Sequence, residues 1–205
     1  MTSVKEDLHE YLRIARKNML WKLDGLTEYQ KRRPMTPTGT NLLGLVKHLA
    51  ITEYGYFGIT FGREFPARFA ELEASAVARL NSDMWATAEE SSESIVALYR
   101  EAWEHSDKTI EANELDTVGR VLHWPVEKQE VTLHRVLVHM CIETNRHAGH
   151  ADILRELIDN SVGLRLGNEN MADGDAAWWD QYRSELETVA QEADDTHSAK
   201  RRSDE

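Results

Sequence analysis

Several features that would place this protein outside the cytoplasm are missing from its sequence. Cys141 is the only cysteine among 205 residues, so the chain has no internal disulfide and a reducing compartment is expected. No apolar run approaches the ~20 residues that a membrane-spanning helix needs. The charged N-terminal segment, MTSVKEDLHEYLR, lacks the apolar core of a signal peptide. These absences predict a cytoplasmic protein with no membrane-spanning segment.

Positive charge is also scarce. The chain has 24 Lys and Arg residues against 36 Asp and Glu residues, which gives a formal net charge of −12. Binding to nucleic acid or to an acidic membrane surface needs an excess of basic residues, so neither is expected as a partner. The motifs GxSxG and HExxH and the phosphate-binding P-loop are absent as well, so the chemistry has to be sought in other residues.

Apolar residues recur at helical spacing in four long segments, and no segment alternates in the way that strands do. Thr40 or Asn41, Ser91 or Ser92, and Thr132 are the expected N-caps of the last three helices. The four expected helices span residues 4–27, 41–61, 91–112 and 132–160. With long first and third connections, they predict an all-α, antiparallel-type four-helix bundle without a sheet of consequence. Several smaller helical subdomains are the alternative, but no clear linker supports them.

The rest of the chain is less regular. Residues 63–89 include a segment, FAELEASAVARL, that can form a short helix, and residues 114–130 are irregular. After Gly163 apolar residues thin out, with one short helix expected at residues 176–189. The final segment, QEADDTHSAKRRSDE, has no core pattern. We expect one helical bundle domain at residues 1–190 and a polar, disordered tail at residues 191–205.

The segment from His139 to Leu157 carries four side chains that can titrate or bind metal. Each residue of an α-helix turns the direction of its side chain by ~100°. Relative to His139, therefore, His150 lies at about 20°, Glu143 at about 40° and His147 at about 80°. The same stripe carries apolar residues, whereas the opposite face is polar. The four groups thus lie on the face expected to be buried, where an unpaired charge is costly.

His48 lies on the second expected helix, which is apolar almost all round and should be central to the fold. Gly44 and Gly55 flank it. Since each glycine costs a helix ~1 kcal/mol relative to alanine, the pair indicates space kept for something beside His48. Close packing between helices is the alternative explanation.

If the second and fourth helices pack together, His48, Glu143 and His147 bring two imidazoles and one carboxylate to one place. This donor set suits Zn²⁺, and also Fe²⁺ or Ni²⁺, and leaves coordination positions open for water or substrate. Such an ion would lower the pKa of a bound water or thiol. A buried Glu–His hydrogen-bond network is the alternative. His139 would support Glu143, and His150 would be a fourth ligand, a proton relay or a hydrogen-bonding neighbour of the site.

Taken together, these segments resemble the DinB/YfiT-like superfamily of metal-binding four-helix proteins. The resemblance is carried by GLTEYQKRRPMTPTGTNLLGLVKHLAITEYGYFG at residues 25–58 and by TLHRVLVHMCIETNRHAGHADILRELID at residues 132–159, within a span from Leu8 to Gly163. The chain is most similar to the actinobacterial-type branch that includes mycothiol-dependent enzymes. The resemblance implies an up-down-down-up bundle, and because many members form dimers, a homodimer. Tyr54, Phe57 and the Trp178–Trp179 pair are candidate contact residues, with core packing as their alternative.

In this superfamily one metal ligand comes from the second helix and two, spaced four residues apart, come from a later helix. Many members use three histidines, the last of them in an HRGQ-like context, and here HAGH stands in that context. This match implies that His48 and His147 are ligands and that Glu143 replaces the middle histidine. It puts His150 at the glutamine position, which favours a place near the site over direct ligation. A His, Glu, His set also resembles that of mycothiol-dependent maleylpyruvate isomerase, and Zn²⁺ or Ni²⁺ is the expected ion.

The expected function is that of a metal-dependent thiol S-transferase, because members of the superfamily use mycothiol, bacillithiol or glutathione in this way. The substrates would be a low-molecular-weight thiol, such as mycothiol, and an electrophile. Two alternatives use the same residues. One is a hydrolase, in which His150 or Glu53 moves a proton. The other is a metal- or ligand-binding protein without turnover, and the sequence does not choose between an enzyme and a binding protein.

Overall fold

The computed structural model describes residues 2–63, 69, 71–72, 74 and 79–203. The chain divides into two compact units, Met1–Glu169 and Asn170–Glu205. Helices predominate, which confirms the all-α class. Half of residues 69–80, where a short helix is expected, lie outside the described residues. The division into a domain and a tail at residue 190 stays a prediction.

The first expected helix ends early, and a separate short helix follows it. α1 (Val4–Trp21) begins at a capping box in which Ser3 and Glu6 satisfy each other's backbone N–H groups. The chain then turns through Gly25, whose φ of +75° suits glycine. A second capping box, formed by Thr27 and Gln30, starts the short helix α2 (Glu28–Arg32). The prediction of one helix to residue 27 was therefore wrong at its end, because a local cap and turn overrode the continuing apolar spacing.

α3 (Leu42–Phe57) is the central helix of the first unit. Asn41 caps it, with its side chain accepting a hydrogen bond from the N–H of Gly44. Twelve of the 16 residues of α3 are buried, as expected for a helix that is apolar on nearly every side. The helix ends at Gly58 and is followed by a 3₁₀ turn, η1 (Ile59–Phe61).

The second half of the unit contains α5 (Ser92–Ala112), capped by Ser91, and α6 (Leu133–Asp159), capped by Thr132. Between them, β1 (Val118–Arg120) and β2 (Glu130–Thr132) form an antiparallel hairpin in which Gly119 pairs with Val131. This hairpin corrects the expectation of wholly irregular structure at residues 114–130. Strands of three residues are too short to show an alternating pattern. Two further 3₁₀ turns are η2 (Ser82–Met84) and η3 (Val126–Lys128).

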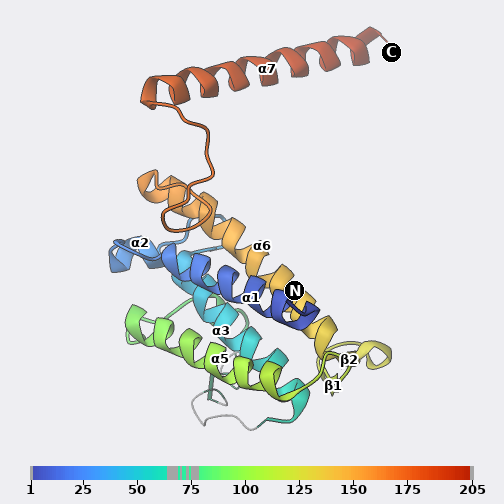
Figure 1. Cartoon of the computed structure of the whole chain (residues 1–205). Helices are drawn as coiled ribbons and strands as arrows, with labels where there is room; N and C mark the ends of the chain where they lie inside the picture. The colour runs from blue at the N-terminus through green and yellow to red at the C-terminus, as the bar shows by residue number, and fades with distance from the viewer. Residues whose placement is uncertain (1, 64–68, 70, 73, 75–78, 204–205) are drawn as a thin grey trace. The chain divides into compact units, whose positions relative to one another are not determined.

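Figure 1 shows the four long helices of this unit lying side by side, with α3 and α5 running in one direction and α1 and α6 in the other. The expected up-down-down-up order is thus what the chain adopts. α3 packs against both α5 and α6, and α1 packs against α6. Buried leucine and aromatic side chains from these helices form two clusters, one along most of α3 and one at its C-terminal end. The central position of α3 puts His48 beside α6.

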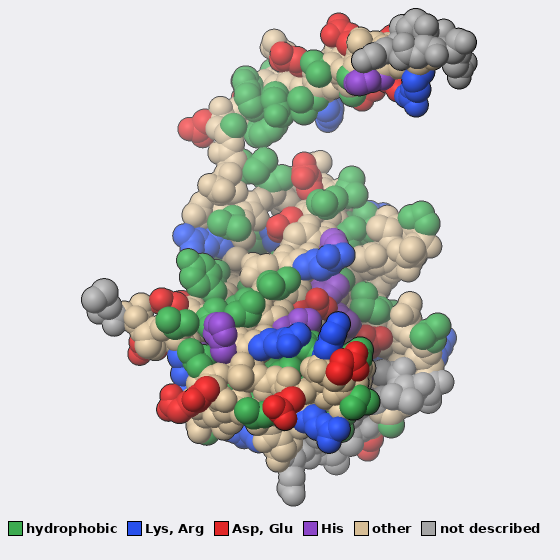
Figure 2. Space-filling model, turned by 90° about the vertical axis from the view of Figure 1, so that its right-hand side faces the viewer, with side chains coloured by type: hydrophobic (Ala, Val, Ile, Leu, Met, Phe, Trp, Pro, Cys, Tyr) green, Lys and Arg blue, Asp and Glu red, His purple; other side chains and the backbone are tan. Residues whose placement is uncertain are grey.

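The second unit contains α7 (Ala176–Ser203). This helix runs well past the expected short helix at residues 176–189 and through most of the segment expected to be disordered. The helix continues past residue 189 because residues 190–203 are rich in Ala, Glu, Gln, Lys and Arg. These residues favour helix even without a core. Hydrophobic side chains gather on one part of α7, where Trp178 and Tyr182 stack (Figure 2). Among the described residues no helix combines the length and apolar character that crossing a membrane requires.

A buried ionic cluster ties α1, α3 and α5 together. The side chain of Arg16 is 1% exposed, and its guanidinium contacts the carboxylate of the fully buried Glu53. The same guanidinium lies 2.7 Å from the carboxylate of Asp107. The His9 ring lies 2.7 Å from the same Asp107 oxygen. Burial raises the pKa of Glu53, and the charge of Arg16 opposes that rise. Burial would also raise the pKa of Asp107, but the contacts with His9 and Arg16 lower it to about 2.

The depressed pKa of Asp107 predicts a component of acid unfolding. In the unfolded chain the carboxyl titrates near 3.8, and in the folded protein at about 2, so its contribution to stability is present above pH 4 and lost as the pH falls towards 2. The free energy of unfolding should therefore fall by about 2 kcal/mol more in the wild type than in Asp107→Asn over this range. Urea unfolding of both proteins from pH 6 to 2 measures the difference, and parallel curves would contradict it.

Candidate metal centre

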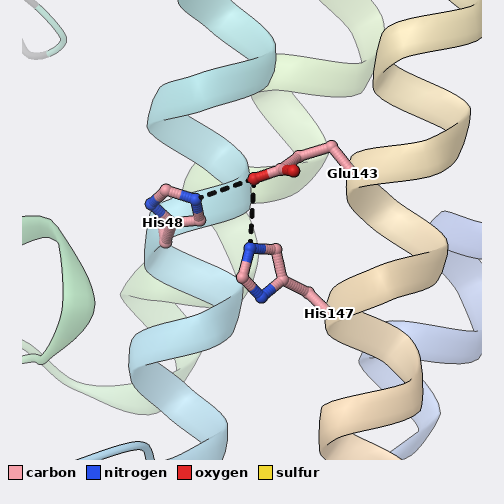
Figure 3. A group of neighbouring side chains, drawn as sticks. All are labelled: His48, Glu143 and His147. Atoms are coloured by element: carbon pink, nitrogen blue, oxygen red, sulfur yellow. Dashed lines mark hydrogen bonds and ion pairs between the residues drawn. The ribbon is translucent and has the colours of Figure 1, made fainter. Parts of the chain in front are cut away.

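His48 on α3 and the pair Glu143 and His147 on α6 point towards one another (Figure 3). Glu143 Oε1 lies 3.3 Å from His48 Nε2 and 3.1 Å from His147 Nε2. All three ligand atoms lie within 4.8 Å of one another, and no other group of this kind is found among the described residues. The helix packing thus brings together the three side chains that the sequence put forward.

Asp83, a residue that the sequence analysis did not single out, sets the tautomer of His48. Its carboxylate oxygen lies 2.7 Å from His48 Nδ1, and because an ionised carboxylate only accepts, Nδ1 carries the proton. The Nε2 lone pair of a neutral His48 then faces Glu143 and lies 3.4 Å from the Thr52 hydroxyl. A carboxylate behind a histidine is a frequent support for metal-binding imidazoles.

The Nδ1 atom of His147, which faces away from Glu143, also has a neighbour. Its Nδ1 lies 3.4 Å from His150 Nδ1, so the Nδ1–H of His147 can point at His150 while Nε2 faces Glu143. Burial lowers the pKa of His147, and the nearby His48 lowers it further, so the ring is neutral at neutral pH. Burial would raise the pKa of Glu143, but its contacts with His48 and His147 lower it, so the carboxylate is ionised.

The donor set fits a divalent ion. Two imidazole lone pairs and one carboxylate oxygen face the same small space, and like lone pairs repel unless a cation lies between them. Zn–N distances of ~2.0–2.1 Å at tetrahedral angles place ligand atoms roughly 3.3–3.4 Å apart. The separations of 3.1 and 3.3 Å from Glu143 Oε1 to the two imidazole nitrogens are close to this value. Three protein ligands would leave at least one position open, as catalytic sites do.

Because Gly44 has no side chain, the segment that carries Asp83 can lie close to α3. A Cβ at this position would lie 1.8 Å from the Met84 carbonyl oxygen, so any side chain here would displace residues 82–84. The same segment is held by Asn41, whose amide donates to the Met84 carbonyl, and by Lys47, which donates to that of Trp85. The glycine therefore serves close packing, but against a 3₁₀ turn in a connection and not between two long helices, which was the alternative explanation. Gly55, in contrast, has no atom within 4 Å of a Cβ position and borders a cavity.

A cavity of about 510 Å³ lies beside His48 and Glu143. Its walls come from α3, η1, the hairpin region and α6, and they are mostly apolar, with Ile51, Ile59 and Leu122 among them. The volume is that of a small-molecule pocket. His48 and Glu143 thus border a half-open, mostly apolar space, and Figure 2 shows histidines lying among Lys and Arg side chains on one face of this unit.

A polar group lies at the end of the cavity away from His147. Tyr56 accepts a hydrogen bond from the indole N–H of Trp124 at 3.0 Å and lies 3.3 Å from His123 Nε2. The His139 ring packs against Tyr56, with ring centroids 4.6 Å apart. Burial raises the pKa of Tyr56, so its hydroxyl keeps its proton at neutral pH and can donate it in a hydrogen bond.

The structure corrects several expectations about individual residues. His139 lies against the rings of Tyr56 and Trp124 and makes no hydrogen bond with Glu143, although both are described. Glu53 cannot move a proton at the site, because it is buried against Arg16 on the other side of α3. Tyr54 and Phe57 are 2% and 0% exposed, so core packing explains them and they form no contact surface in this unit.

The sequence did not indicate Asp83, Tyr56 or the roles of His123 and Trp124. Asp83 and the last two lie in segments without periodicity, where no pattern indicates which helix they face. Tyr56 lies two turns beyond His48 on α3, about 80° away by helix geometry, but an apolar helix with several aromatic residues gives no reason to select it. Only the packing of the loops against α3 identifies these residues.

Asp83→Asn should weaken divalent-metal binding by about 10–100-fold, because the neutral amide no longer raises the basicity of His48. A competition titration with a chromophoric chelator measures this affinity. Asp116→Asn, at an exposed carboxylate outside the site, is the matched control and should bind as the wild type does. Equal affinity of both variants would show that Asp83 does not support a ligand.

A family model described as mycothiol-S-transferase matches residues 7–160. The comparison with curated proteins gave no match. Among solved structures, that of a conserved protein from Enterococcus faecalis is similar with a TM-score of 0.60 and 15% identity, over 78% of this chain and 100% of that one. At this identity the likeness supports the fold alone.

Proposed function

The chain belongs to the mycothiol S-transferase family, within the DinB/YfiT-like superfamily, and from this premise we propose that it is a metal-dependent thiol S-transferase. The family implies a small-molecule thiol as substrate. The observation that carries the proposal is the convergence of His48, Glu143 and His147 at the edge of an apolar cavity. We propose these three as the ligands of one divalent ion, Zn²⁺ or Ni²⁺, and mycothiol or a similar low-molecular-weight thiol as the co-substrate.

A bound divalent ion would supply Lewis acidity that lowers the pKa of a thiol at the open position. The chain's own residues prepare that position. Asp83 and His150 orient the two imidazoles so that their lone pairs face inwards, and Glu143 gives the ion one compensating negative charge. Cys141, the only thiol of the chain, donates to the Leu8 carbonyl between α1 and α6, away from the cavity. The nucleophilic sulfur therefore has to come from a substrate.

The cavity provides the place for the electrophile. Its apolar walls would exclude water from the reacting atoms, and the Tyr56 hydroxyl would donate a hydrogen bond to an acceptor atom of the electrophile. We propose that Tyr56, held by Trp124 and packed against His139, positions the electrophile for attack by the thiol.

Removing the Tyr56 hydroxyl isolates this role. In Tyr56→Phe the value of kcat/KM for thiol transfer should fall about tenfold, the effect of one hydrogen bond that strengthens as the reaction proceeds. Metal stoichiometry should stay unchanged, because Tyr56 is not a ligand. Tyr11→Phe, at an exposed residue of α1, is the control. A wild-type rate in Tyr56→Phe would remove Tyr56 from the reaction.

The activity itself is tested by a co-substrate screen. Metal-loaded protein is mixed with monochlorobimane and with mycothiol, bacillithiol, glutathione or water in turn. Conjugation forms a carbon–sulfur bond as the carbon–chlorine bond breaks, releasing chloride and the thiol proton, and bimane fluorescence reports it. We expect turnover with one thiol, its loss in His48→Ala, and its retention in His134→Ala, at an exposed histidine of α6.

Two other results would contradict this proposal and support a different function. Hydrolysis of an ester or amide panel without any dependence on thiol would identify a metal-dependent hydrolase. No turnover in either assay, together with tight metal binding, would identify a non-enzymatic metal-binding protein. A cytoplasmic location and a homodimer remain predictions, and light scattering at micromolar concentration measures the second.

A further inference from the structure

A second cavity, of about 500 Å³, lies between α1 and α5 and has a chemistry unlike that of the first. α1 and the turn after it, α5, and the loop that follows α6 supply its walls. It shares no lining residue with the cavity beside His48. The two are therefore separate sites of the same compact unit.

Cationic side chains surround this second cavity. Lys17, Arg100 and Arg165 line it, and Asp24 is the one acidic residue among its described lining. No carboxylate of the described residues lies within ion-pair distance of any of the three cations. By contrast, the well-buried cations of the unit are paired, as Arg16 is with Glu53. Three unpaired cations around one cavity, in a chain with a net charge of −12, favour an anionic occupant.

Two tryptophans also line the cavity. Trp21 and Trp103 are both half-buried and both line it. Indole rings offer flat apolar surface to a ring system or an acyl chain, and guanidinium groups bind carboxylates and sulfonates through paired N–H donors. The volume is within the range of small-molecule sites.

From this combination we propose that the α1–α5 cavity binds a small organic anion with a flat apolar body, such as an aromatic carboxylate or sulfonate. The apolar body lies against Trp21 and Trp103, and the anionic group lies between Arg100 and Arg165. The proposal is independent of thiol transfer, because it uses none of the residues assigned to that reaction.

The test uses 2-naphthoate as the probe and the indole N–H signals of the full-length ¹⁵N-labelled protein as the readout. The six tryptophans give separate reporters, assigned by Trp→Phe variants. We expect the signals of Trp21 and Trp103 to shift saturably, while that of Trp124, beside the first cavity, does not move. The neutral analogue 2-naphthamide should bind about tenfold more weakly or not at all, and added salt should weaken naphthoate binding.

Variants locate the anionic group. Arg100→Gln and Arg165→Gln should each raise the Kd for naphthoate about tenfold. Both side chains are exposed, so circular dichroism should show an unchanged fold. Lys108→Gln, about two turns further along α5 and outside the cavity, is the control and should leave the Kd unchanged. Equal binding of naphthoate and naphthamide, a shift of Trp124 alone, or no saturable shift at millimolar naphthoate would overturn the proposal. So would shifts of Trp21 and Trp103 that follow protein concentration instead of the probe, since these would identify a self-association surface.

Discussion

Protein carrying His147→Ala is expected to lose its divalent ion. Loss of a residue that only supports a ligand weakens metal binding by about 10–100-fold, so loss of a ligand should weaken it by more than about 100-fold. Elemental analysis of protein purified without chelator or nickel resin measures the stoichiometry, which should fall from about one ion per chain in the wild type to nearly none. His134→Ala, on the same helix but exposed, should retain the ion.

The pH dependence of metal affinity provides a second test of the same site. Ligation needs neutral imidazole, so metal affinity should fall as the pH falls through the range in which His147 gains a proton. Because burial and the neighbouring His48 lower the pKa of His147, this loss should occur at a lower pH than for an ordinary histidine. Full metal content in His147→Ala would contradict the ligand assignment. A wild-type protein that takes up neither Zn²⁺ nor Ni²⁺ would instead support a metal-free Glu–His network.

Arg16→Leu should cause the largest loss of stability of any single change considered for this chain. The substitution leaves the fully buried Glu53 without its cationic partner, and removing one member of a buried pair costs about 3–5 kcal/mol. Urea unfolding at neutral pH measures this loss. Arg13→Leu, on the same helix but 40% exposed with contacts of 3.6 Å or more, should cost less than about 1 kcal/mol.

Two further measurements separate the ion pair from simple loss of packing. Without Arg16, burial is no longer opposed by a cation and the charge of Asp107 adds to it, so the pKa of Glu53 rises further and the variant should lose stability as the pH rises above the ordinary range of a glutamate. The double variant Arg16→Met with Glu53→Leu removes both charges and should recover most of the loss. A double variant as unstable as Arg16→Leu would show that packing, and not the unpaired carboxylate, is responsible.

The ionic cluster also explains a limit of sequence analysis. Glu53 lies on the same helix as His48 and was a candidate for proton transfer. Five residues separate it from His48, which places it about 140° around the helix. The spacing indicates that the two side chains leave α3 in different directions, but not what each one meets. In the folded unit Glu53 contacts Arg16 of α1, whereas His48 lies against Glu143 of α6.

By itself the sequence determined the helical class, the N-cap at Thr132 and the candidate ligands, and it narrowed two further N-caps to Thr40 or Asn41 and to Ser91 or Ser92. Caps and helical periodicity are local, because they depend on residues three or four positions apart. The Glu143–His147 pair follows from the same spacing. His48 was put forward by its place on an apolar helix between Gly44 and Gly55, and the resemblance to a family agreed with it. These predictions needed no knowledge of which helices are neighbours.

Only the tertiary structure decided which groups complete the site. Asp83, 35 residues from His48, reaches its Nδ1 because Gly44 lets the segment 82–84 lie against α3. Trp124 reaches Tyr56 because the hairpin region folds over the same helix. Such contacts depend on how irregular segments pack onto helix faces. Helical periodicity in the sequence does not report these contacts. The residues could therefore be identified only from the packed tertiary structure.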